Sequence, residues 1–303
     1  MHPVTIPPFL RAGDTVGICA PARKIAREDL ETAVHTLESW GLYVALSENL
    51  FGADNQFSGT DEQRAQDLQS LLDDPEIKAV ISARGGYGTL RIIDRIDFAS
   101  FRENPKWIAG YSDITVLHSH IHRNFHTASL HATMPVNFGK DAYSTETLRR
   151  ALFGEALGYK CASAPGAANV PGLCEGQLVG GNLSLLYALQ GSASDISTAG
   201  KILFLEDLDE YLYHVDRMVM SLDRAGKFSD LRGLIVGGMN EMKDNAVPFG
   251  KTAETIIAET AAKYRFPVCF GFPAGHDVKN YALPLGKTIR LDVSEAGASV
   301  EFL

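Results

Sequence analysis

The sequence predicts an α/β fold, because patterns typical of strands and of helices alternate along the first half of the chain. A second observation supports this class: several glycine-rich or polar motifs come directly after predicted strands, where open α/β sheets form their sites. A length of 303 residues with 45% hydrophobic side chains leaves room for about two domains, each with its own core.

The first half predicts a parallel sheet covered by helices on both faces. Short apolar runs predict strands at 15–20, 43–47, 79–83 and 107–109. Amphipathic stretches predict helices at 27–40, 61–72, 88–96 and 113–123. The 61–72 helix has the clearest ends, because Ser-Gly-Thr leads into it and Asp-Asp-Pro stops it. Strands separated by helices in this way imply βαβ units.

An Ala/Gly/Pro-rich stretch at 156–170 is predicted to be a linker. It separates an N-terminal α/β domain at 1–155 from a C-terminal domain at 171–303. In the second half, strands are predicted at 175–179, 201–205, 233–237, 268–270 and 288–291. Helices are predicted at 184–189, 211–225 and 251–264. The last two strands follow each other closely, so this domain is predicted to have a β-rich end.

Charge and composition exclude several function classes. The net charge of −9 comes without a basic run, which argues against nucleic acid and anionic membrane surfaces as partners. No apolar run approaches the roughly 18 residues that span a bilayer, and no secretory signal pattern opens the chain. We therefore expect a cytoplasmic protein. Reduced, mostly buried thiols are expected at the four scattered cysteines, Cys19, Cys161, Cys174 and Cys269.

Ser112 is the first candidate catalytic residue. It stands in a Gly-Tyr-Ser turn between the 107–109 strand and the 113–123 helix. A serine on such a turn is lifted clear of the sheet beside a helix N-terminus, as in a nucleophile elbow. The match to G-x-S-x-G is incomplete, because no second glycine follows, and serine is also a common helix cap. The pattern alone leaves both interpretations open.

Two further motifs offer backbone N–H groups after strands. The run 84–88 (Arg-Gly-Gly-Tyr-Gly) follows the 79–83 strand, and its glycines let N–H groups converge on an anion, although a tight turn explains them as well. Asn182, in Gly-Gly-Asn-Leu at 180–183, either points its amide at a cleft or caps the next helix.

Glu206 and His276 are the candidates from the second half. Glu206 follows the 201–205 strand at the head of an acidic run that also suits a helix start or a metal site. A carboxylate orienting a histidine is a third possibility, and the carboxylate at the very end of a buried strand is the best placed to be functional. His276 lies in a Gly/Pro-rich loop after the 268–270 strand, held by a rigid frame yet accessible.

A group of histidines after Ser112 is the rival to this assignment. His118 and His122 share a helix face at i, i+4 spacing, but the glutamate of an H-E-x-x-H zinc helix is missing. A partly exposed helix without metal is the simpler interpretation. The crowded histidines are His118, His120, His122, His126 and His131.

Taken together, these segments resemble the LD-carboxypeptidase family of serine peptidases. The matching segments, in family order, are 16–22 (VGICAPA), 83–88 (ARGGYG), 110–115 (GYSDIT), 180–183 (GGNL), 203–207 (LFLED) and 275–276 (GH). The chain departs from the family where His-Gly-Pro is usual, since residues 131–135 read His-Ala-Thr-Met-Pro.

The resemblance implies a catalytic triad of Ser112, Glu206 and His276. It also implies a flavodoxin-like N-terminal domain, a small α/β barrel-like C-terminal domain with the site between them, a homodimer, and neither metal nor organic cofactor. Backbone N–H groups of Gly86 and Asp113 are our candidates for the oxyanion hole. The Asp113 side chain is expected to cap its helix.

The family substrate is the murein tetrapeptide, from which terminal D-alanine is removed at the L-centre of a diamino acid, usually meso-diaminopimelate. A cytoplasmic role in muropeptide recycling follows from the resemblance. The free carboxylate of this peptide needs a cation, and Arg84 is our candidate. The alternative for Arg84 is an ion pair with an acidic neighbour such as Glu206 or Asp207.

Two other functions compete with this one. A microcin-immunity type hydrolase of peptidyl or aminoacyl nucleotides uses the same chemistry, but an aromatic for the adenine is wanted in the C-terminal domain, and Trp40 and Trp107 both lie in N-terminal elements. A non-catalytic binding protein for murein peptides is the alternative of a different class. Such a protein does not require Ser112, Glu206 and His276 to meet.

Overall fold

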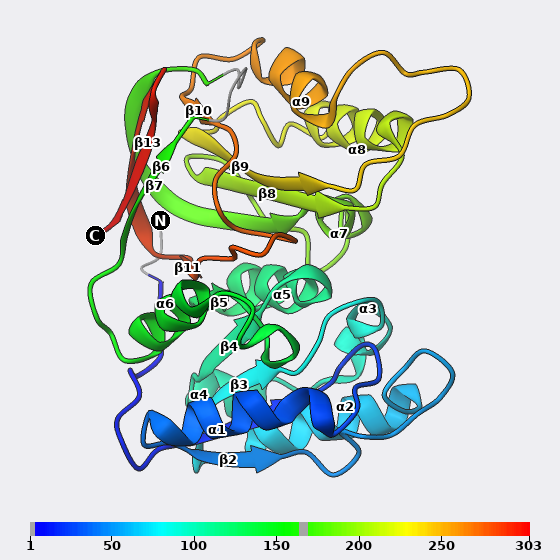
Figure 1. Ribbon diagram of the computed structural model, residues 1–303, viewed down its shortest axis with the longest axis vertical. Helices are drawn as coiled ribbons and strands as arrows, with labels where there is room; N and C mark the ends of the chain where they lie inside the picture. Colours follow the sequence, from blue (N-terminus) through cyan, green and yellow to red (C-terminus); the bar gives the residue numbers. More distant parts are fainter. Residues whose placement is uncertain (1–3, 164–168) are drawn as a thin grey trace.

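The computed structural model describes residues 4–163 and 169–303. Figure 1 shows two sheets, one above the other, with the helix α5 (Thr115–Phe125) between them. α5 contacts strands of both sheets. The fold is mixed α/β, as predicted.

The lower sheet of Figure 1 has six strands in the order β11-β5-β4-β3-β1-β2. The five N-terminal strands are parallel, and β11 joins β5 in antiparallel orientation. The bounds are β1 Thr15–Cys19, β2 Tyr43–Leu46, β3 Ile77–Ser82, β4 Trp107–Gly110, β5 Ser129–His131 and β11 Leu283–Leu285. The parallel sheet predicted for the first half is thus confirmed, but one edge strand comes from near the end of the chain.

Helices and 3₁₀ turns connect these strands. Local signals explain α2 best, since Thr60 and Gln63 form a capping box at its start. α4, α6 and η4 were not predicted. The bounds are η1 Glu28–Leu30, α1 Glu31–Ser39, α2 Asp61–Asp73, α3 Thr89–Ile92, η2 Ile93–Arg95, α4 Ala99–Glu103, η3 Ser112–Ile114, η4 Pro135–Asn137 and α6 Ala142–Leu152.

The upper sheet has seven strands in the order β10-β9-β8-β7-β12-β13-β6. β7 to β10 are parallel, while β12, β13 and β6 extend the sheet in antiparallel pairs, which is the β-rich end predicted for this half. The bounds are β6 Gly158–Ala162, β7 Gly172–Asn182, β8 Ile202–Leu208, β9 Gly233–Asn240, β10 Val268–Cys269, β12 Thr288–Ser294 and β13 Gly297–Phe302. The helices here are α7 Leu183–Ala188, α8 Leu212–Arg224 and α9 Ala253–Ala261.

The predicted linker is wrong in part, because residues 158–162 form the strand β6 and pair with β13. The Ala/Gly/Pro-rich composition hid this strand, and its hydrogen bonds come from a segment far along the chain. The rest of the alanine-rich core of the linker, 164–168, lies outside the described residues.

The upper sheet is strongly curved. Its two edge strands approach each other closely enough for the Sγ atoms of Cys161 on β6 and Cys269 on β10 to lie 3.9 Å apart. The ladders themselves run from β10 to β6 without closing. All four cysteines are free thiols.

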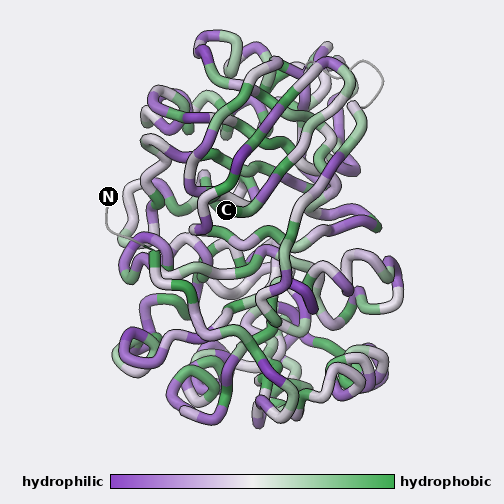
Figure 2. Tube along the Cα trace, turned by 90° about the vertical axis from the view of Figure 1, so that its left-hand side faces the viewer, coloured by the Kyte–Doolittle hydropathy of each residue, from purple (hydrophilic) through white to green (hydrophobic). Residues whose placement is uncertain are grey.

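The hydrophobic core is continuous between the two halves. One cluster of buried residues includes Trp107 and Leu130 of the lower sheet together with Phe204 and Leu291 of the upper sheet. On β12, exposed and buried residues alternate, and Figure 2 shows such alternation of colours along the upper strands. A shared core fixes the two sheets relative to each other, and the site lies between them.

Candidate functional site

Ser112, Glu206 and His276 come together at the carboxyl ends of strands from both sheets. Ser112 follows β4, Glu206 lies near the end of β8, and His276 stands in the loop after β10. The carboxyl ends of parallel strands are where open α/β sheets place their sites. Residues separated by up to 164 positions in the sequence therefore meet in one place.

Ser112 occupies a sharp turn between β4 and the helical segment η3–α5. Its φ is 62°, in the left-handed region that few non-glycine residues adopt. Gly110 has a φ of 154°, and a Cβ on it would lie 2.8 Å from the Ile114 side chain. This tight backbone turns Ser112 away from the sheet, so the elbow geometry expected from the sequence is present.

The three side chains form a chain of hydrogen bonds. Nε2 of His276 lies 3.0 Å from Oγ of Ser112. Nδ1 of His276 lies 2.7 Å from Oε2 of Glu206, and the same oxygen accepts the His276 backbone N–H at 3.2 Å. Glu206 is completely buried, whereas 15% of the His276 side chain remains exposed. The His276 ring is thus partly accessible to solvent, and its Nδ1 atom contacts a carboxylate that is shielded from solvent.

The charges of Glu206 and His276 support each other. Burial alone raises the pKa of Glu206, but the charge and hydrogen bond of His276 outweigh burial and bring that pKa below its usual value. Burial lowers the pKa of His276, and the Glu206 carboxylate outweighs it, so the pKa of His276 is raised. Glu206 is therefore an anion beside a histidine made more basic.

Local backbone features aim the Glu206 side chain. The register between β8 and β9 shifts between Leu205 and Asp207, which places Glu206 in a bulge. Gly275 has a φ of 112°, and a Cβ on it would lie 2.7 Å from Oε2 of Glu206. Only glycine lets the loop pass this close to the carboxylate.

A cavity of about 370 Å³ opens in front of Ser112. Both halves line it, with Ser112, Tyr111 and Arg84 on one side and His276, Asn182 and Asp207 on the other. A cavity of this size suits a small peptide or a drug-sized ligand.

Two glycines after β3 border the nucleophile. A Cβ on Gly85 would lie 2.9 Å from the Ser112 Cβ, so this turn packs directly against the serine. Gly86, a predicted oxyanion donor, lines the cavity and has a φ of 116°. The other predicted donor, Asp113, follows Ser112 and is fully buried.

The expected role of the Asp113 side chain is corrected by the structure. Its carboxylate accepts the backbone N–H of Thr89 at 2.7 Å and so caps the start of α3, not of its own helix. Burial raises the pKa of Asp113, with this hydrogen bond acting in the opposite direction. The residue joins the glycine turn to the elbow.

Three cationic side chains line the cavity. Arg84, predicted from the sequence, donates to the Lys24 carbonyl oxygen at 3.4 Å. The expected alternative does not hold, since no ion pair in the described ranges joins Arg84 to Glu206 or Asp207. Arg23 and Lys140 were missed. Arg23 lies shortly after the first predicted strand, and this position is the signal that could have identified it.

Asn182 and Asp207 form a second polar group on the cavity wall. Asn182 caps α7 and donates its amide to Asp207 at 2.9 Å. Asp207 also accepts the backbone N–H groups of Ser184 and Leu208. Burial, together with the nearby Glu206 charge, raises the pKa of Asp207 to about 7. Both interpretations of Asn182 hold, because it caps a helix and lines the cavity.

The histidines of α5 are structural. The ring nitrogens of His118 bond Ser129 Oγ at 2.8 Å and the Gly110 carbonyl oxygen at 2.9 Å. Burial lowers the pKa of His118 and of His122 to about 3. Within the described residues, no group of three or more histidine, cysteine or acidic side chains is arranged to hold a metal ion. The helix is partly exposed as predicted, at Arg123 and Asn124, but His118 and His122 are on its buried side.

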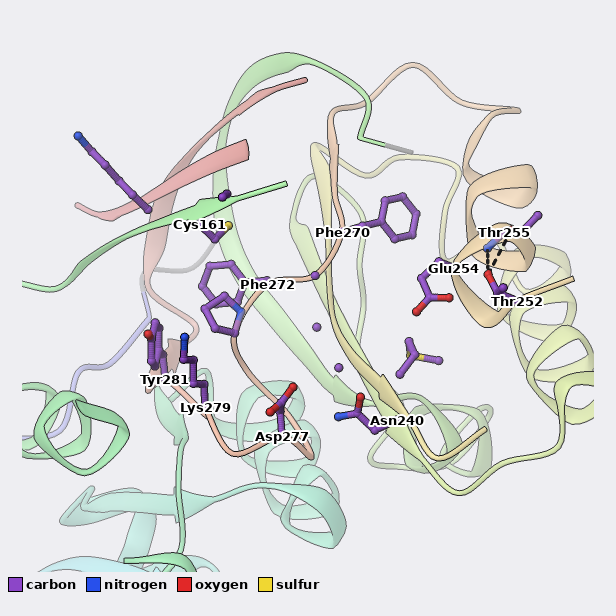
Figure 3. Close-up of a pocket in the computed structure, with 17 residues that line it drawn as sticks. Cys161, Asn240, Thr252, Glu254, Thr255, Phe270, Phe272, Asp277, Lys279 and Tyr281 are labelled. Carbon is purple, nitrogen blue, oxygen red and sulfur yellow. Dashed lines mark hydrogen bonds between the residues drawn. The ribbon is translucent and has the colours of Figure 1, made fainter. Parts of the chain in front are cut away.

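A second cavity, of about 810 Å³, lies on the other side of the His276 loop and contains none of the three hydrogen-bonded residues. Figure 3 shows Cys161, Phe272 and Tyr281 on one side of it and the start of α9, with Thr252 and Glu254, on the other. Its size alone does not make it the site of chemistry.

In the described ranges, no helix is both long enough and apolar enough to cross a membrane.

Comparison with known proteins gives matches along most of the chain. The model of the LD-carboxypeptidase N-terminal domain matches residues 16–132, and the model of the C-terminal domain matches residues 175–291. A probable murein peptide carboxypeptidase of Bacillus subtilis is 39% identical over 89% of this chain and 86% of its own. A murein tetrapeptide carboxypeptidase of Pseudomonas aeruginosa is 31% identical over 88% of this chain and 89% of its own.

Solved structures agree with these matches. A muramoyltetrapeptide carboxypeptidase from Oxalobacter formigenes superposes with a TM-score of 0.84 at 27% identity, over 95% of this chain and 98% of its own. The microcin C7 self immunity protein, in complex with aspartyl sulfamoyl adenosine, superposes with a TM-score of 0.87 at 23% identity, over 98% of both chains. The second likeness shows a common fold.

Proposed function

Because the chain belongs to the LD-carboxypeptidase family, we propose that it is a serine peptidase acting on murein tetrapeptides. In this proposal it hydrolyses the L,D-peptide bond and releases the terminal D-alanine. The observation that carries the proposal is the hydrogen-bonded chain Ser112–His276–Glu206 at a cavity between the two halves. The carboxypeptidase names of the relatives support the substrate class.

The geometry suits nucleophilic catalysis by Ser112. Nε2 of His276 is within reach of the Oγ proton and accepts it as Oγ attacks the scissile carbonyl carbon. The imidazolium then protonates the departing amine of D-alanine. Water, deprotonated by His276, releases the peptide from the acyl-enzyme. Glu206 holds Nδ1–H and stabilises the imidazolium in both steps.

The oxyanion of the tetrahedral intermediate needs donors close to Ser112. We assign this role to the backbone N–H groups of Gly86 and Asp113, on either side of the elbow. Their aim is fixed by the backbone, so they need no reorganisation during the reaction. Loss of one such donor typically costs about 100- to 1000-fold in rate.

The free carboxylate of D-alanine needs a positive charge near the scissile bond. Arg84 is our first candidate, and Arg23 and Lys140 also line the cavity. Arg84→Ala is expected to raise KM for the tetrapeptide about tenfold with a smaller effect on kcat. An unchanged KM in Arg84→Ala removes this residue from substrate recognition.

The decisive experiment follows D-alanine release by mass spectrometry from L-Ala-γ-D-Glu-meso-diaminopimelate-D-Ala. The native protein is compared with Ser112→Ala and with the control Ser119→Ala, a buried serine of α5 outside the cavity. Release by the native protein and the control, but not by Ser112→Ala, supports the proposal. Release by all three keeps the reaction and rejects Ser112 as nucleophile.

Absence of release by all three, with cleavage of an aminoacyl sulfamoyl adenylate instead, would favour the acyl-nucleotide branch. Neither Trp40 nor Trp107 lines the cavity around Ser112, so a stacking tryptophan for a nucleobase is missing from its lining. Peptide binding without cleavage of either substrate would favour the binding-protein alternative. The proposal also includes a cytoplasmic homodimer, which sedimentation and cell fractionation test.

A further inference from the structure

Glu206 and two neighbouring side chains carry buried polar atoms that have no hydrogen-bond partner. These atoms are Oε1 of Glu206, both ring nitrogens of His131 and Nδ2 of Asn280. The relative exposure of the three residues is 0%, 0% and 3%. Buried polar groups are rarely left unpaired, so a cluster of them in one place calls for a joint explanation.

The three residues lie around the same carboxylate. His131 ends β5, and its ring packs edge-on between Tyr111 and Phe204, at centroid distances of 5.9 and 4.8 Å. The side chains of Glu206 and Asn280 both lie near this ring, and burial lowers the pKa of His131 to about 4 while the Glu206 charge acts in the opposite direction. Asn280 is held in place because its Oδ1 accepts the Gly275 N–H at 2.9 Å.

The donors and acceptors of this cluster match. A neutral histidine offers one N–H donor and one acceptor nitrogen. Asn280 Nδ2 is a donor in need of an acceptor, and the Glu206 carboxylate oxygen Oε1 is an acceptor in need of a donor. His131 is therefore the one member able to serve both neighbours at once.

We propose that His131 is a positioning residue for the catalytic carboxylate, in a hydrogen-bonded chain from Asn280 Nδ2 through the neutral His131 ring to Glu206 Oε1. An ordered water bridges the chain where two side chains are too far apart for a direct bond. Oε2 is held by His276, so His131 holds the other oxygen. The carboxylate is then fixed at both ends. Its catalytic consequence rests on the proposed function.

The proposed hydrogen-bonded chain also affects the pKa of His276. A donor at Oε1 draws negative charge away from Oε2 and weakens the pull of the carboxylate on the imidazolium. Removing that donor concentrates charge at Oε2, which makes His276 more basic. The other ionisable groups around His276 and His131 are Asp207, Glu241, Tyr111, His118, Arg23, Arg84 and Lys140.

The test is an NMR titration of the His276 ring in the ligand-free protein. His131→Leu is expected to raise the pKa of His276 by about half a unit to one unit. His131→Gln, which keeps one donor and one acceptor, is expected to restore the native value to within about 0.2 unit. The control is His122→Leu, a buried histidine of α5 that also has an unpartnered ring nitrogen and is expected to leave the titration unchanged.

An unchanged pKa of His276 in a folded His131→Leu variant overturns the proposal, as does an equal shift in the glutamine and leucine variants. If His131→Leu does not fold, His131→Met gives the same comparison, since its flexible side chain adapts to the space. The titration needs no substrate, so it stands even if the tetrapeptide is not cleaved. Where the peptide is cleaved, the acid limb of kcat/KM moves upward with the titration and KM stays unchanged.

Discussion

Glu206 and Asp207 are adjacent on β8, equally buried and of the same charge type, yet they differ in protonation. Their relative exposures are 0% and 2%. Burial acts on both groups, but the charge and hydrogen bond of His276 bring the pKa of Glu206 below its usual value, whereas burial and the Glu206 charge raise the pKa of Asp207 to about 7 against hydrogen bonds from neutral groups. Burial alone therefore does not decide the state of a carboxyl group. The partner on its side of the strand decides it.

The alternation of side chains along β8 accounts for this division. Successive residues of a strand point to opposite faces of the sheet, so the carboxylates of Glu206 and Asp207 leave β8 in different directions. One direction leads to the loop after β10, and the other leads to the start of α7. We expect the first carboxylate to serve catalysis and the second to hold the wall of the cavity.

The largest expected effect comes from neutralising the carboxylate on the catalytic side. Glu206→Gln is expected to lower kcat for the tetrapeptide by about 1000- to 10000-fold, because the amide supports neither the tautomer nor the imidazolium. Asp207→Asn, the matched change one residue away, is expected to stay within about tenfold of the native protein. Equal losses in the two variants would abolish the distinction between the two faces of β8.

A smaller effect is expected from crowding the Glu206 side. Gly275→Ala puts a methyl group 2.7 Å from Oε2 at a φ of 112°, and we expect a loss of about 10- to 100-fold in kcat. Gly191→Ala is the control, because its φ of 75° is also strained but no atom lies within 4 Å of the added Cβ. Activity assays on both variants separate a displaced carboxylate from backbone strain, which by itself costs stability only.

The next prediction is a pH dependence of kcat/KM, which is set by His276 and its partner Glu206. His276 acts as a base only when neutral, and its pKa is raised above the ordinary 6.5. kcat/KM is therefore expected to fall about tenfold for each pH unit below that raised pKa. In Glu206→Gln the midpoint is expected to move to lower pH, since burial then acts on His276 without the carboxylate. A midpoint that does not move would separate Glu206 from the histidine.

The smallest effect on activity, and the clearest on stability, is expected from Asp207. Its pKa in the folded protein is about 7, above the ordinary 3.8, so the native state binds this proton more tightly than the unfolded state does. The resulting stability is present below about pH 4 and is lost as the pH rises to 7. Asp207→Asn removes this dependence of stability on pH. Between pH 4 and 7 the free energy of unfolding of the native protein should therefore fall by about 2 kcal/mol or more relative to that of the variant.

Denaturant unfolding of the native protein and of Asp207→Asn at pH 4.5, 6 and 7.5 measures this difference. If the free energies of unfolding of the two proteins change in parallel with pH, Asp207 is ionised throughout, and the N–H groups of Ser184 and Leu208 hold its charge.

Local patterns predicted the elements near Ser112 well. The strand, the turn and the helix follow one another in the sequence, so neighbouring residues determine the elbow. The same holds for α2, whose capping signals are local. Glu206 and His276 stood out as polar residues after buried strands, but only the family resemblance connected them with Ser112.

What the sequence did not reveal depends on contacts between distant segments. β6 and β11 are short, and their pairing partners lie far away along the chain. Arg23 and Lys140 line the cavity only because the loops after β1 and β5 fold over the same place. His131 looked like one histidine among several, because nothing in its own segment shows that Glu206 and Asn280 lie beside it.

The loop that carries His276 begins in one sheet and ends in the other. β10 anchors it in the upper sheet, and β11 pairs with β5 in the lower sheet (Figure 1). A separation of the two halves would have to break the pairing of β11 with β5 or extend the loop before β11, so we expect substrate exchange to use side-chain and loop adjustments. We also expect the two halves, which share one core cluster, to unfold together. A chain divided between 163 and 169 would leave the first fragment with β5 paired on one edge only, to β4, and with a nucleophile that has no base.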